Sequence, residues 1–515
     1  MEWTAGYASG VEYVAGFYRE QSPAYLNFVC VLNGYEPVPI DRPFTYFELG
    51  FGRGLTVNVQ AAANPQGRFY AADFNPAHVC GAQQLADAAK LGNLTLLENS
   101  FAELAAGEVA GLPQFDFITL HGIYTWVSRE NRAHVRQFIK RYLKPGGIVF
   151  VSYNAMPGWA QSQPLQRLLR EHAALHPART DAQIEQARGF FGKMVEAKAG
   201  YFVRNPNVEP RLQVLKTGSP QYLVHEYLNE HWEPLYHADV ARELGEEAKL
   251  EYAGSAELPL AFQAVYLSQD KQDLLKSIND ATVRETVKDY MLDTTFRKDV
   301  FVRGARTMRQ QRYLEAMFQF GLALTVPRGQ ITMKMKLPFG EVNAREEVYQ
   351  PVLDALAQRP CPLSELGALP ALQGKPLSQL VQMVALLTAT GQACIYPLHQ
   401  PGPTAGSAAA MNRALTAQLP YGDDYQVLVS PLLGNGITVS TVMSLVYLML
   451  ATPGTPNDAA AIAARAWRIM AAQGRKLLRD GKPIEGDEQN LAELTIQIGE
   501  ILSKNLPVWR QLGML

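Results

Sequence analysis

FTYFELGFGRGLTV, residues 44–57, places a run of aromatic and β-branched residues directly before a loop with glycine at every second position. This composition predicts a strand over 44–49, and the residues after the loop predict a helix over roughly 54–63. The loop has the pattern E-x-G-x-G-x-G, which begins at Glu48 and ends at Gly54. Glycines let a ligand approach the backbone closely, and free amides at a helix start receive anionic groups. We therefore expect a nucleotide-like ligand at this turn.

Four more strand-like runs follow, with spacers of helical character between them. They are GRFYAADF at 67–74, NLTLLENS at 93–100, FDFITLHG at 115–122 and GGIVFVSYN at 146–154. Strands that alternate with helices in this way are typical of βαβ units in a parallel sheet. The segment therefore predicts an α/β fold of the Rossmann-like type.

The alternation stops after the fifth strand. Helical patterns fill 160–200, and strand character returns at 249–258 and 262–268, which we expect to finish the sheet. Residues 270–303 have a helical pattern. The intervening helical residues therefore form an insertion above the ligand edge of the sheet.

The middle of the chain predicts a hairpin followed by a helix–turn–helix unit of winged-helix type. FGLALTV at 320–326 and ITMKMKL at 331–337 would form the hairpin. A DNA reader needs Lys or Arg along its recognition helix, but residues 376–391 carry no charge. We therefore favour a packing or protein-contact module over a DNA-binding one.

These patterns divide the chain into consecutive units. We expect an N-terminal helical arm over 1–43, the ligand-binding Rossmann-like domain over 44–155, a helical insertion or regulatory region over 156–245, the end of the sheet with further helices over 246–304, an α+β winged-helix-like middle domain over 305–398, and a helical C-terminal domain over 413–515. The stretch 399–412 has the composition of a linker.

The overall composition excludes several classes of protein. The 515 residues have a formal net charge of −2, which gives no bulk attraction to nucleic acid or to an anionic membrane. The four cysteines are too dispersed for a disulfide scaffold or a zinc site, so we expect free thiols. The N-terminus lacks the pattern of a signal peptide, and the apolar stretch 437–451 is too short to cross a bilayer. We expect a soluble, cytoplasmic protein with a buried helix at that stretch.

Three kinds of ligand compete for the glycine loop. A Walker loop would need Lys and Ser or Thr after its last glycine, and these are absent. A dinucleotide fingerprint has the spacing G-x-G-x-x-G, but here the third glycine comes one residue early and Leu55 takes its place. The third ligand is S-adenosylmethionine, which has an amino-acid end, a ribose and an adenine but no phosphate. Glu48 would reach toward its amino group.

The ends of the following strands carry side chains that suit such a ligand. Asp73 lies 25 residues after Glu48, where an acidic residue can accept both ribose hydroxyls, although an N-cap of the next helix is the alternative. A polar side chain after the third strand could bind the adenine amine, and Phe101 could stack on the ring. The residues that we expect to contact the cofactor are Tyr18, Glu48, Leu49, Gly50, Gly52, Gly54, Asp73, Phe74, Asn75, Asn99, Ser100, Phe101 and His121.

The chain resembles the class I S-adenosylmethionine-dependent methyltransferases, and more narrowly the bacterial subfamily that carries a methyltransferase regulatory domain. The resemblance rests on ELGFGRG, ADFNPAHV, FDFITLHGIYTWVS, LKPGGIVFVSYNAMPGW and YLVHEYLNEHWEPLYHADVARELGEEAKLEYAGSAEL, and it is close over about residues 10–310. It implies a Rossmann-like catalytic domain, a middle domain, a C-terminal domain and a possible homodimer. Members studied structurally include protein-lysine methyltransferases, which implies a protein substrate.

Methyl transfer is an in-line displacement in which a lone pair attacks the methyl carbon, so the enzyme aligns the reactants and excludes water. A lysine amine has an ordinary pKa of about 10.4, which an apolar channel lowers. Aromatic side chains at strand ends, together with Tyr18 of the N-terminal arm, are candidates for such a channel, with core packing as the alternative. His121 is the best titratable candidate, either as a contact to the methionine moiety or as a proton acceptor. The catalytic candidates are His121, Tyr124, Trp126, Tyr153 and Trp159.

The stretch HEYLNEHWEP, which begins at His225, raises the question of a metal site. A metalloprotease motif has two histidines four residues apart, whereas His225 and His231 are six apart and fall on different faces of a helix. We expect no metal. A polar network, or an entrance for the substrate lined by Glu226 and Tyr227, fits the pattern better.

Three functions remain open from the sequence. The first is methylation of a protein, with lysine as the favoured acceptor, and the large region after residue 310 supports it as a docking surface. The second is methylation of a small amine or hydroxyl metabolite. The third is a non-catalytic scaffold or sensor that only binds the cofactor.

Overall fold

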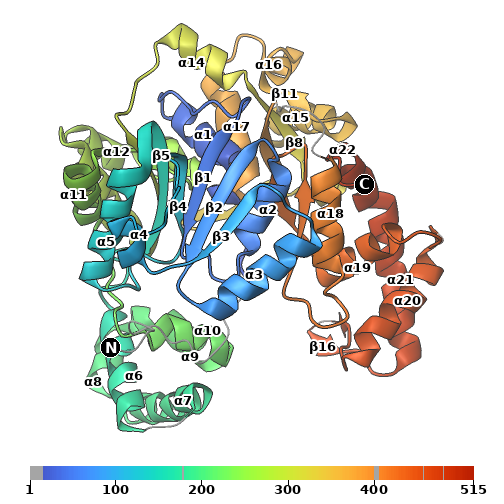
Figure 1. Ribbon diagram of the computed structural model, residues 1–515, viewed down its shortest axis with the longest axis horizontal. Helices are drawn as coiled ribbons and strands as arrows, with labels where there is room; N and C mark the ends of the chain where they lie inside the picture. The colour runs from blue at the N-terminus through green and yellow to red at the C-terminus, as the bar shows by residue number, and fades with distance from the viewer. Residues whose placement is uncertain (1–14, 177–178, 400–404, 456, 480) are drawn as a thin grey trace.

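The computed structural model describes residues 15–176, 179–399, 405–455, 457–479 and 481–515. Its centre is a seven-stranded sheet in the order β3-β2-β1-β4-β5-β7-β6 (Figure 1). All neighbouring strands are parallel except β7, which runs antiparallel to both β5 and β6. The strands are β1 (Phe44–Leu49), β2 (Gly67–Asp73), β3 (Leu94–Glu98), β4 (Phe115–Leu120), β5 (Leu143–Asn154), β6 (Leu250–Ser255) and β7 (Phe296–Arg303). This sheet confirms the expected Rossmann-like fold and the first five strands.

Helices cover both faces of the sheet because the side chains of each strand alternate between two cores. Tyr46 belongs to one core and its neighbour Phe47 to the other, and both are fully buried. The helices α1 (Pro23–Leu32), α2 (Leu55–Ala63) and α3 (Pro76–Ala88) contribute to the first core. The helices α4 (Phe101–Ala106), α5 (Arg129–Tyr142) and α11 (His237–Ala248) contribute to the second.

The last strand of the sheet differs from the expected one. Residues 262–268 are not a strand, since they include a short 3-10 helix, Gln263–Val265. The seventh strand is β7, which follows α12 (Gln269–Lys276) and α13 (Ala281–Leu292). β7 carries three consecutive charged residues, Arg297, Lys298 and Asp299. They interrupt the alternation of apolar residues by which a strand is predicted from sequence. Arg297 and Asp299 are buried in an ion pair, so tertiary contacts rather than periodicity place this strand.

The insertion after β5 is a helical unit with its own small core. It contains α6 (Gln163–Leu175), α7 (Thr180–Glu196), α8 (Gly200–Arg204), α9 (Glu209–Thr217) and α10 (Pro220–Tyr227). Figure 1 shows these helices grouped beyond one end of the sheet. The insertion therefore lies where the expected ligand edge of the sheet is.

The middle domain has a three-stranded sheet in the order β11-β8-β12, with its helices packed beside it. The predicted hairpin between 320–326 and 331–337 is wrong: β8 pairs with both neighbours in that sheet, and 334–337 pairs with the residues that follow it. The domain shares one hydrophobic core with the catalytic sheet. Its elements are α14 (Gln310–Met317), β8 (Phe320–Leu324), β9 (Lys334–Leu337), β10 (Gly340–Asn343), α15 (Glu346–Gln358), β11 (Cys361–Pro362), α16 (Leu363–Gly367), α17 (Leu377–Ala389) and β12 (Ala393–Pro397).

The C-terminal region is mainly helical, and it begins earlier than expected. Residues 405–412 were expected in a linker, but they belong to α18 (Ala405–Thr416), because the alanines of this stretch pack against α2 and α3. The apolar stretch near 437–451 contains the buried helix α19 (Thr441–Leu450), as predicted. The other elements are β13 (Val427–Ser430), β14 (Asn435–Thr438), α20 (Ala459–Ala472), β15 (Leu478–Arg479), β16 (Lys482–Pro483), α21 (Asp487–Glu500) and α22 (Leu506–Gln511).

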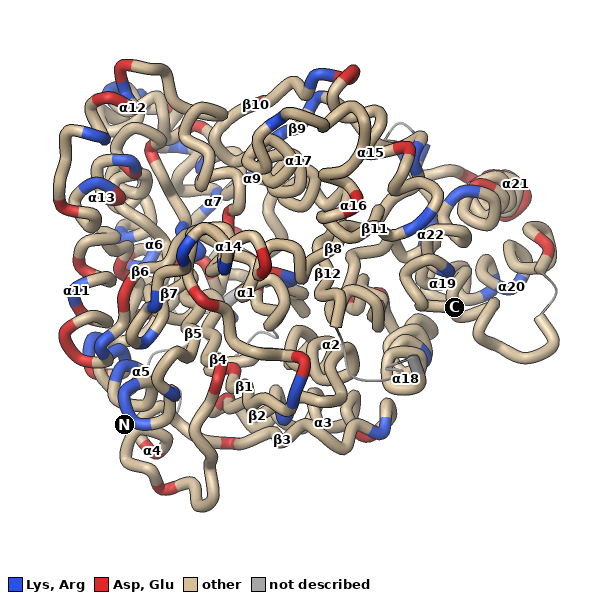
Figure 2. Tube along the Cα trace, turned by 90° about the horizontal axis from the view of Figure 1, so that it is seen from above, with Lys and Arg blue, Asp and Glu red and all other residues tan. Residues whose placement is uncertain are grey.

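Charged residues of both signs are interspersed along the outer elements, as Figure 2 shows around α5, α11, α12 and α13. Among the helices of the described residues, none combines the length and the apolar character that a bilayer crossing requires. Cys30, Cys361 and Cys394 are buried free thiols, and Cys80 is an exposed one. The thiols are therefore free, as predicted.

Candidate functional site

The glycine loop between β1 and α2 has a backbone that other residues rarely adopt. Gly50, Gly52 and Gly54 have φ values of 66°, 57° and 70°, in the left-handed region that costs side-chain-bearing residues about 1 kcal/mol or more. Space is also short at both ends of the loop. A Cβ on Gly50 would lie 2.5 Å from Cδ1 of Ile123, and one on Gly54 would lie 2.5 Å from Cβ of Ala82. The alternating glycines are thus required by the turn itself.

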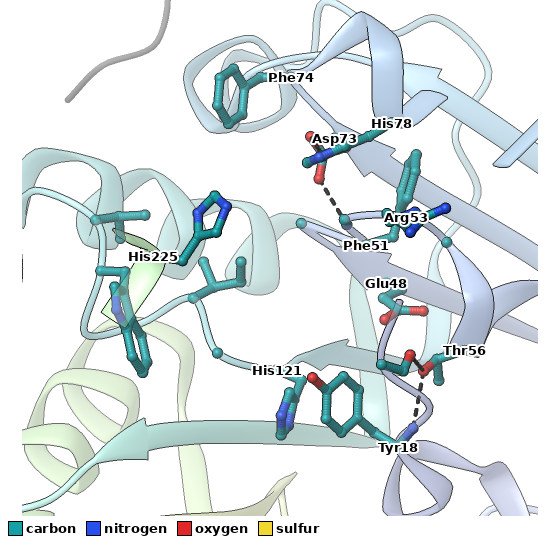
Figure 3. A pocket seen from close by; sticks show the side chains of 18 of the residues that line it. Tyr18, Glu48, Phe51, Arg53, Thr56, Asp73, Phe74, His78, His121 and His225 are labelled. Carbon is teal, nitrogen blue, oxygen red and sulfur yellow. Dashed lines mark hydrogen bonds and ion pairs between the residues drawn. The ribbon is translucent and has the colours of Figure 1, made fainter. Parts of the chain in front are cut away.

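A cavity of about 220 Å³ opens beside this loop, between the sheet and α10 (Figure 3). The structure brings most of the predicted cofactor residues to its wall. They are Tyr18, Glu48, Gly50, Gly52, Gly54, Asp73, Phe74, Asn99, Ser100, Phe101 and His121. Leu49 and Asn75 are not among the lining residues: Leu49 lies in the core, and Asn75 caps α3 through its side chain.

Asp73, at the end of β2, connects the glycine loop to the next strand end. Its Oδ2 accepts a hydrogen bond from the amide of Gly52 at 2.9 Å, and its Oδ1 accepts one from the amide of Asn75 at 2.9 Å. The Nδ1 atom of His78 lies 3.2 Å from the same Oδ1. Because Asn75 is the N-cap of α3, the alternative role of Asp73 as that cap is wrong. The carboxylate instead borders the cavity, where it can accept hydroxyl groups.

Glu48 is buried below the glycine loop and has an incomplete set of partners. Its Oε1 accepts a weak hydrogen bond from Nε2 of Gln21 at 3.3 Å. Within the described part of the chain, no hydrogen bond satisfies its Oε2. Burial raises the pKa of this carboxyl to about 8, with Asp73 adding to the effect and Gln21 opposing it. A buried acceptor of this kind suits a cationic ligand group, which would supply both the missing contact and the missing charge.

The adenine end of the expected site is formed by the loop after β3. Ser100 uses its hydroxyl and its amide in a capping box with Glu103, so its polar groups already have partners. Asn99 and Phe101 also line the cavity, and the ring of Phe101 lies close to Gly50. The side chains that line the cavity here and suit a purine are the amide of Asn99, which also hydrogen-bonds Glu103, and the aromatic ring of Phe101.

His121, at the end of β4, is held as a neutral ring. It stacks on Tyr18 with ring centroids 3.5 Å apart, and its Nδ1 lies 3.0 Å from the hydroxyl of Ser152. Burial lowers the pKa of this imidazole to about 3, with Glu20 opposing the shift. A group with so low a pKa is a poor proton acceptor at neutral pH. Of its two expected roles, the structure favours contact with the ligand.

Of the aromatic candidates for an acceptor channel, only Trp126 and Tyr18 reach the cavity. Tyr124, Tyr153 and Trp159 do not line it, which corrects the prediction for these three. Tyr124 is buried and donates to Glu243 at 2.7 Å, Tyr153 donates to Asp299 at 2.6 Å, and the indole of Trp159 donates to the carbonyl of Thr295 at 2.9 Å. Their polar groups are used inside the fold, so these side chains have the packing role that was the alternative.

Part of the wall that faces the glycine loop was predicted from the sequence: Glu226 was, whereas Tyr222 and Asn229 were not. Helix α10 contributes Tyr222, His225 and Glu226, and the segment after it contributes Asn229. The spacing of these residues, one helical turn apart, was the available signal. Glu226 was expected at an entrance with Tyr227, but Tyr227 is buried and does not line the cavity. The described residues contain no cluster of three or more potential metal ligands, at His225 or elsewhere.

The structure supports a cofactor with the layout of S-adenosylmethionine. The residues present fit it: Glu48 for a cationic amino group, the loop amides for a carboxylate, Asp73 for a ribose, and Asn99 with Phe101 for an adenine. The remaining wall lies opposite this set, on α10 and the loop after β4.

Comparisons with known proteins agree with this geometry. The family model described as a methyltransferase domain matches residues 47–147, and the one described as a predicted methyltransferase regulatory domain matches residues 219–303. The second match begins at α10 and runs through β6 and β7, so it contains part of the cavity wall and the end of the sheet.

Sequence and structure similarity to known proteins extends over the whole chain. The uncharacterized protein sll1526 of Synechocystis sp. is 38% identical over 519 residues, which cover all of both chains. The uncharacterized protein RP028 of Rickettsia prowazekii is 27% identical over 40% of this chain and 81% of its own. The solved structure of PKMT2 from Rickettsia typhi in complex with AdoHcy has a TM-score of 0.69 and 19% identity, and covers 98% of this chain and 99% of its own. At that identity, the likeness shows a shared fold.

Proposed function

The chain belongs to the class I S-adenosylmethionine-dependent methyltransferases that carry a methyltransferase regulatory domain, and from this premise we propose that it methylates the side-chain amine of lysine in a protein. It is an enzyme, and its cofactor is S-adenosylmethionine. One observation supports the choice of acceptor: next to the cofactor residues, the cavity is lined by apolar side chains. These are Ile123, Trp126 and Val127.

The chain's own residues prepare the reaction in two ways. Glu48 would bind the amino group of the cofactor and Asp73 its ribose hydroxyls, so that both ends of the cofactor would be held in place for the reaction. When bound, S-adenosylmethionine supplies a methyl group on a cationic sulfur that a nucleophile can displace. The apolar wall around Trp126 excludes water from the space in front of it.

An amine needs its lone pair free before it can attack. The ordinary pKa of a lysine amine is about 10.4, and removal from water favours the neutral form. The aromatic face of Trp126 can also hold a methylated ammonium product. The neutral ring of His121 adds no positive charge that would repel the incoming cation. These features favour an amine over a hydroxyl acceptor.

The extent of the fold likeness also supports a protein as the substrate. The fold likeness to PKMT2, a name that abbreviates protein lysine methyltransferase, extends over the middle and C-terminal domains as well as the catalytic one. A metabolite would not need the extra surface that these domains provide.

The test is transfer of label from S-adenosyl-[methyl-³H]methionine into a lysate of cells that lack this chain. We expect label in protein, which acid hydrolysis releases as methyllysine. The matched control is the Gly52→Arg variant, which should transfer none. Label only in small molecules would contradict the protein acceptor, and absence of label with intact cofactor binding would contradict enzymatic activity on lysate components.

A further inference from the structure

The cavity has two chemically different walls. The wall on the sheet side carries the residues assigned to the cofactor. The opposite wall comes from α10 and from the loop between β4 and α5, and most of its side chains there are apolar, aromatic or neutral amides. Glu226 is the exception, because it is the carboxylate that α10 presents to this space. Figure 3 shows its neighbour His225 directed toward the same space, across from Asp73 and His121.

Few positive charges lie near the carboxylate of Glu226. The side chain is half-buried, and the charged group that acts on it is Arg211 of α9. Arg211 stacks over the ring of Trp159, 3.8 Å from its centroid, and also interacts with Tyr227. The titratable groups around Glu226 are thus Arg211 from α9, and Tyr222, His225 and Tyr227 from its own helix. Burial is the dominant influence, and it raises the pKa of the Glu226 carboxyl to about 7.

Three other titratable groups of the cavity are poorly placed to accept a proton from a methyl acceptor. Glu48 and Asp73 lie on the cofactor side, where Asp73 is already engaged by two amides. His121 is neutral and stacked on Tyr18, and burial holds its pKa near 3. Among the titratable residues that line the acceptor side in the described part of the chain, which also include Tyr222 and His225, Glu226 is the carboxylate.

Resting on the proposed function, we propose that Glu226 binds the protonated amine of the substrate and takes its proton before methyl transfer. A carboxylate and an ammonium in an apolar space favour the neutral pair, because removal from water disfavours both charges. The proton leaves the nitrogen for a carboxylate oxygen, directly or through one water. The freed lone pair then forms the N–C bond while the C–S bond breaks and its electron pair stays on sulfur. The secondary ammonium product releases into solvent, and Glu226 returns its proton to water.

The first test measures binding rather than activity. The probe is n-butylamine, the minimal analogue of a lysine side chain, titrated by calorimetry into the full chain saturated with S-adenosylhomocysteine. We expect Glu226→Gln to weaken its binding at least tenfold while leaving the affinity for S-adenosylhomocysteine unchanged. The matched control is Glu230→Gln, since Glu230 is an exposed carboxylate in the turn after α10 and does not line the cavity. Equal binding of n-butylamine by Glu226→Gln and wild type, or no binding by wild type, overturns the proposal.

The second test uses transfer of labelled methyl to poly-L-lysine across a pH range. A positioned acid–base group contributes about 10²–10⁴-fold to such a step, so we expect Glu226→Gln to lower kcat by at least about 100-fold at pH 7.5. The wild-type rate should level off above about pH 7, whereas the variant rate should keep rising toward the amine's own pKa of about 10.4. A variant profile parallel to wild type overturns the proposal. Amine binding that depends on Glu226, without transfer to any protein, would contradict the protein-lysine function and leave the amine site supported.

Discussion

At the residue scale, the carboxyl groups of Asp73 and Glu48 determine the polarity of the cofactor site. They differ in the hydrogen-bond donors that surround them. Asp73 is engaged by two backbone amides and keeps its carboxylate at the cavity. Glu48 is buried with an oxygen that lacks a partner in the described residues, so it holds its proton until a cation arrives. The difference follows from the number of donors that the fold supplies to each carboxylate.

We expect Asp73→Ala to weaken the binding of S-adenosylhomocysteine by about 1–3 kcal/mol, the usual loss for hydrogen bonds to a charged group. Calorimetric titration of the purified protein measures this. Asp87→Ala is the matched control, because Asp87 is exposed on α3, and its side chain accepts a hydrogen bond from Gln83. Equal affinities for the Asp73 variant and wild type would show that this carboxylate does not hold the cofactor.

Glu48 predicts a pH dependence of stability. Its carboxyl has a pKa of about 8 in the folded protein and an ordinary value of 4.5 when unfolded. The folded state therefore binds more protons between these values, and the free energy of unfolding falls as pH rises from 4.5 to 8. Each pKa unit is worth about 1.4 kcal/mol, so the Glu48→Gln variant should gain a few kcal/mol over wild type by pH 8.

Urea unfolding of both proteins at pH 6 and pH 8 checks this prediction without cofactor. The difference between the two proteins cancels the groups that do not interact with Glu48, so it reports on this carboxyl and its coupled neighbours. A constant difference across this range would mean that the buried carboxyl ionises as it does in water.

At the element scale, the turn from β1 to α2 and the residues that cover it act together. We call residues 15–22 the N-terminal strap. Its Tyr18 amide donates to Oγ1 of Thr56 at 3.1 Å, and that hydroxyl donates to the carbonyl of Gly16 at 3.3 Å. The strap thereby places Tyr18 over the start of α2, on the wall of the cavity. One turn and one strap thus enclose the aminoacyl end of the site.

Gly52→Arg should abolish cofactor binding, with at least a 100-fold loss of affinity, while the protein still folds. The left-handed backbone at φ 57° disfavours any side chain, and the arginine would occupy the cavity. Gly81→Arg is the matched control, since a Cβ at Gly81 would meet nothing within 4 Å and the position lies on α3. Circular dichroism and calorimetry together check fold and binding. Unchanged affinity in the Gly52 variant would place the cofactor elsewhere.

At the scale of the whole molecule, the C-terminal region braces the cofactor site. Asn435, beside β13, donates to the carbonyl of Arg19 and to the hydroxyl of Ser22, both at 3.0 Å, and accepts from Gln60 of α2 at 2.8 Å. Arg53 of the glycine loop forms an ion pair with Asp424 at 2.7 Å. Contacts between residues 371 to 416 positions apart in sequence therefore hold the strap and the loop in place.

This arrangement predicts that a change in the C-terminal region affects cofactor affinity. Asn435→Ala should lower the free energy of unfolding by about 1–3 kcal/mol, because it leaves buried groups unsatisfied. It should also weaken the binding of S-adenosylhomocysteine several-fold, since the strap loses its brace. Tyr421→Ala, at a side chain that is 87% exposed in the same region, should change neither quantity. A stability loss without any effect on affinity would show that the strap is held by other contacts.

The sequence by itself determined the catalytic sheet up to β5, the glycine turn and the strand-end residues of the cofactor site. These features are local: glycine is needed wherever φ is positive, and parallel strands bring their carboxyl ends to one edge. Tyr153 shows the limit of such reasoning. It follows Ser152, which contacts His121 at the cavity, and because side chains alternate along a strand, Tyr153 points into the opposite core.

Only the tertiary structure decided what faces the cofactor residues. It placed α10, with Glu226, across the cavity, and it inserted β7 between β5 and β6 despite the charges of that strand. It also brought Asn435 to the N-terminal strap. These outcomes depend on contacts between segments far apart in the chain, where burial and pairing of polar groups outweigh the local pattern of hydrophobic residues.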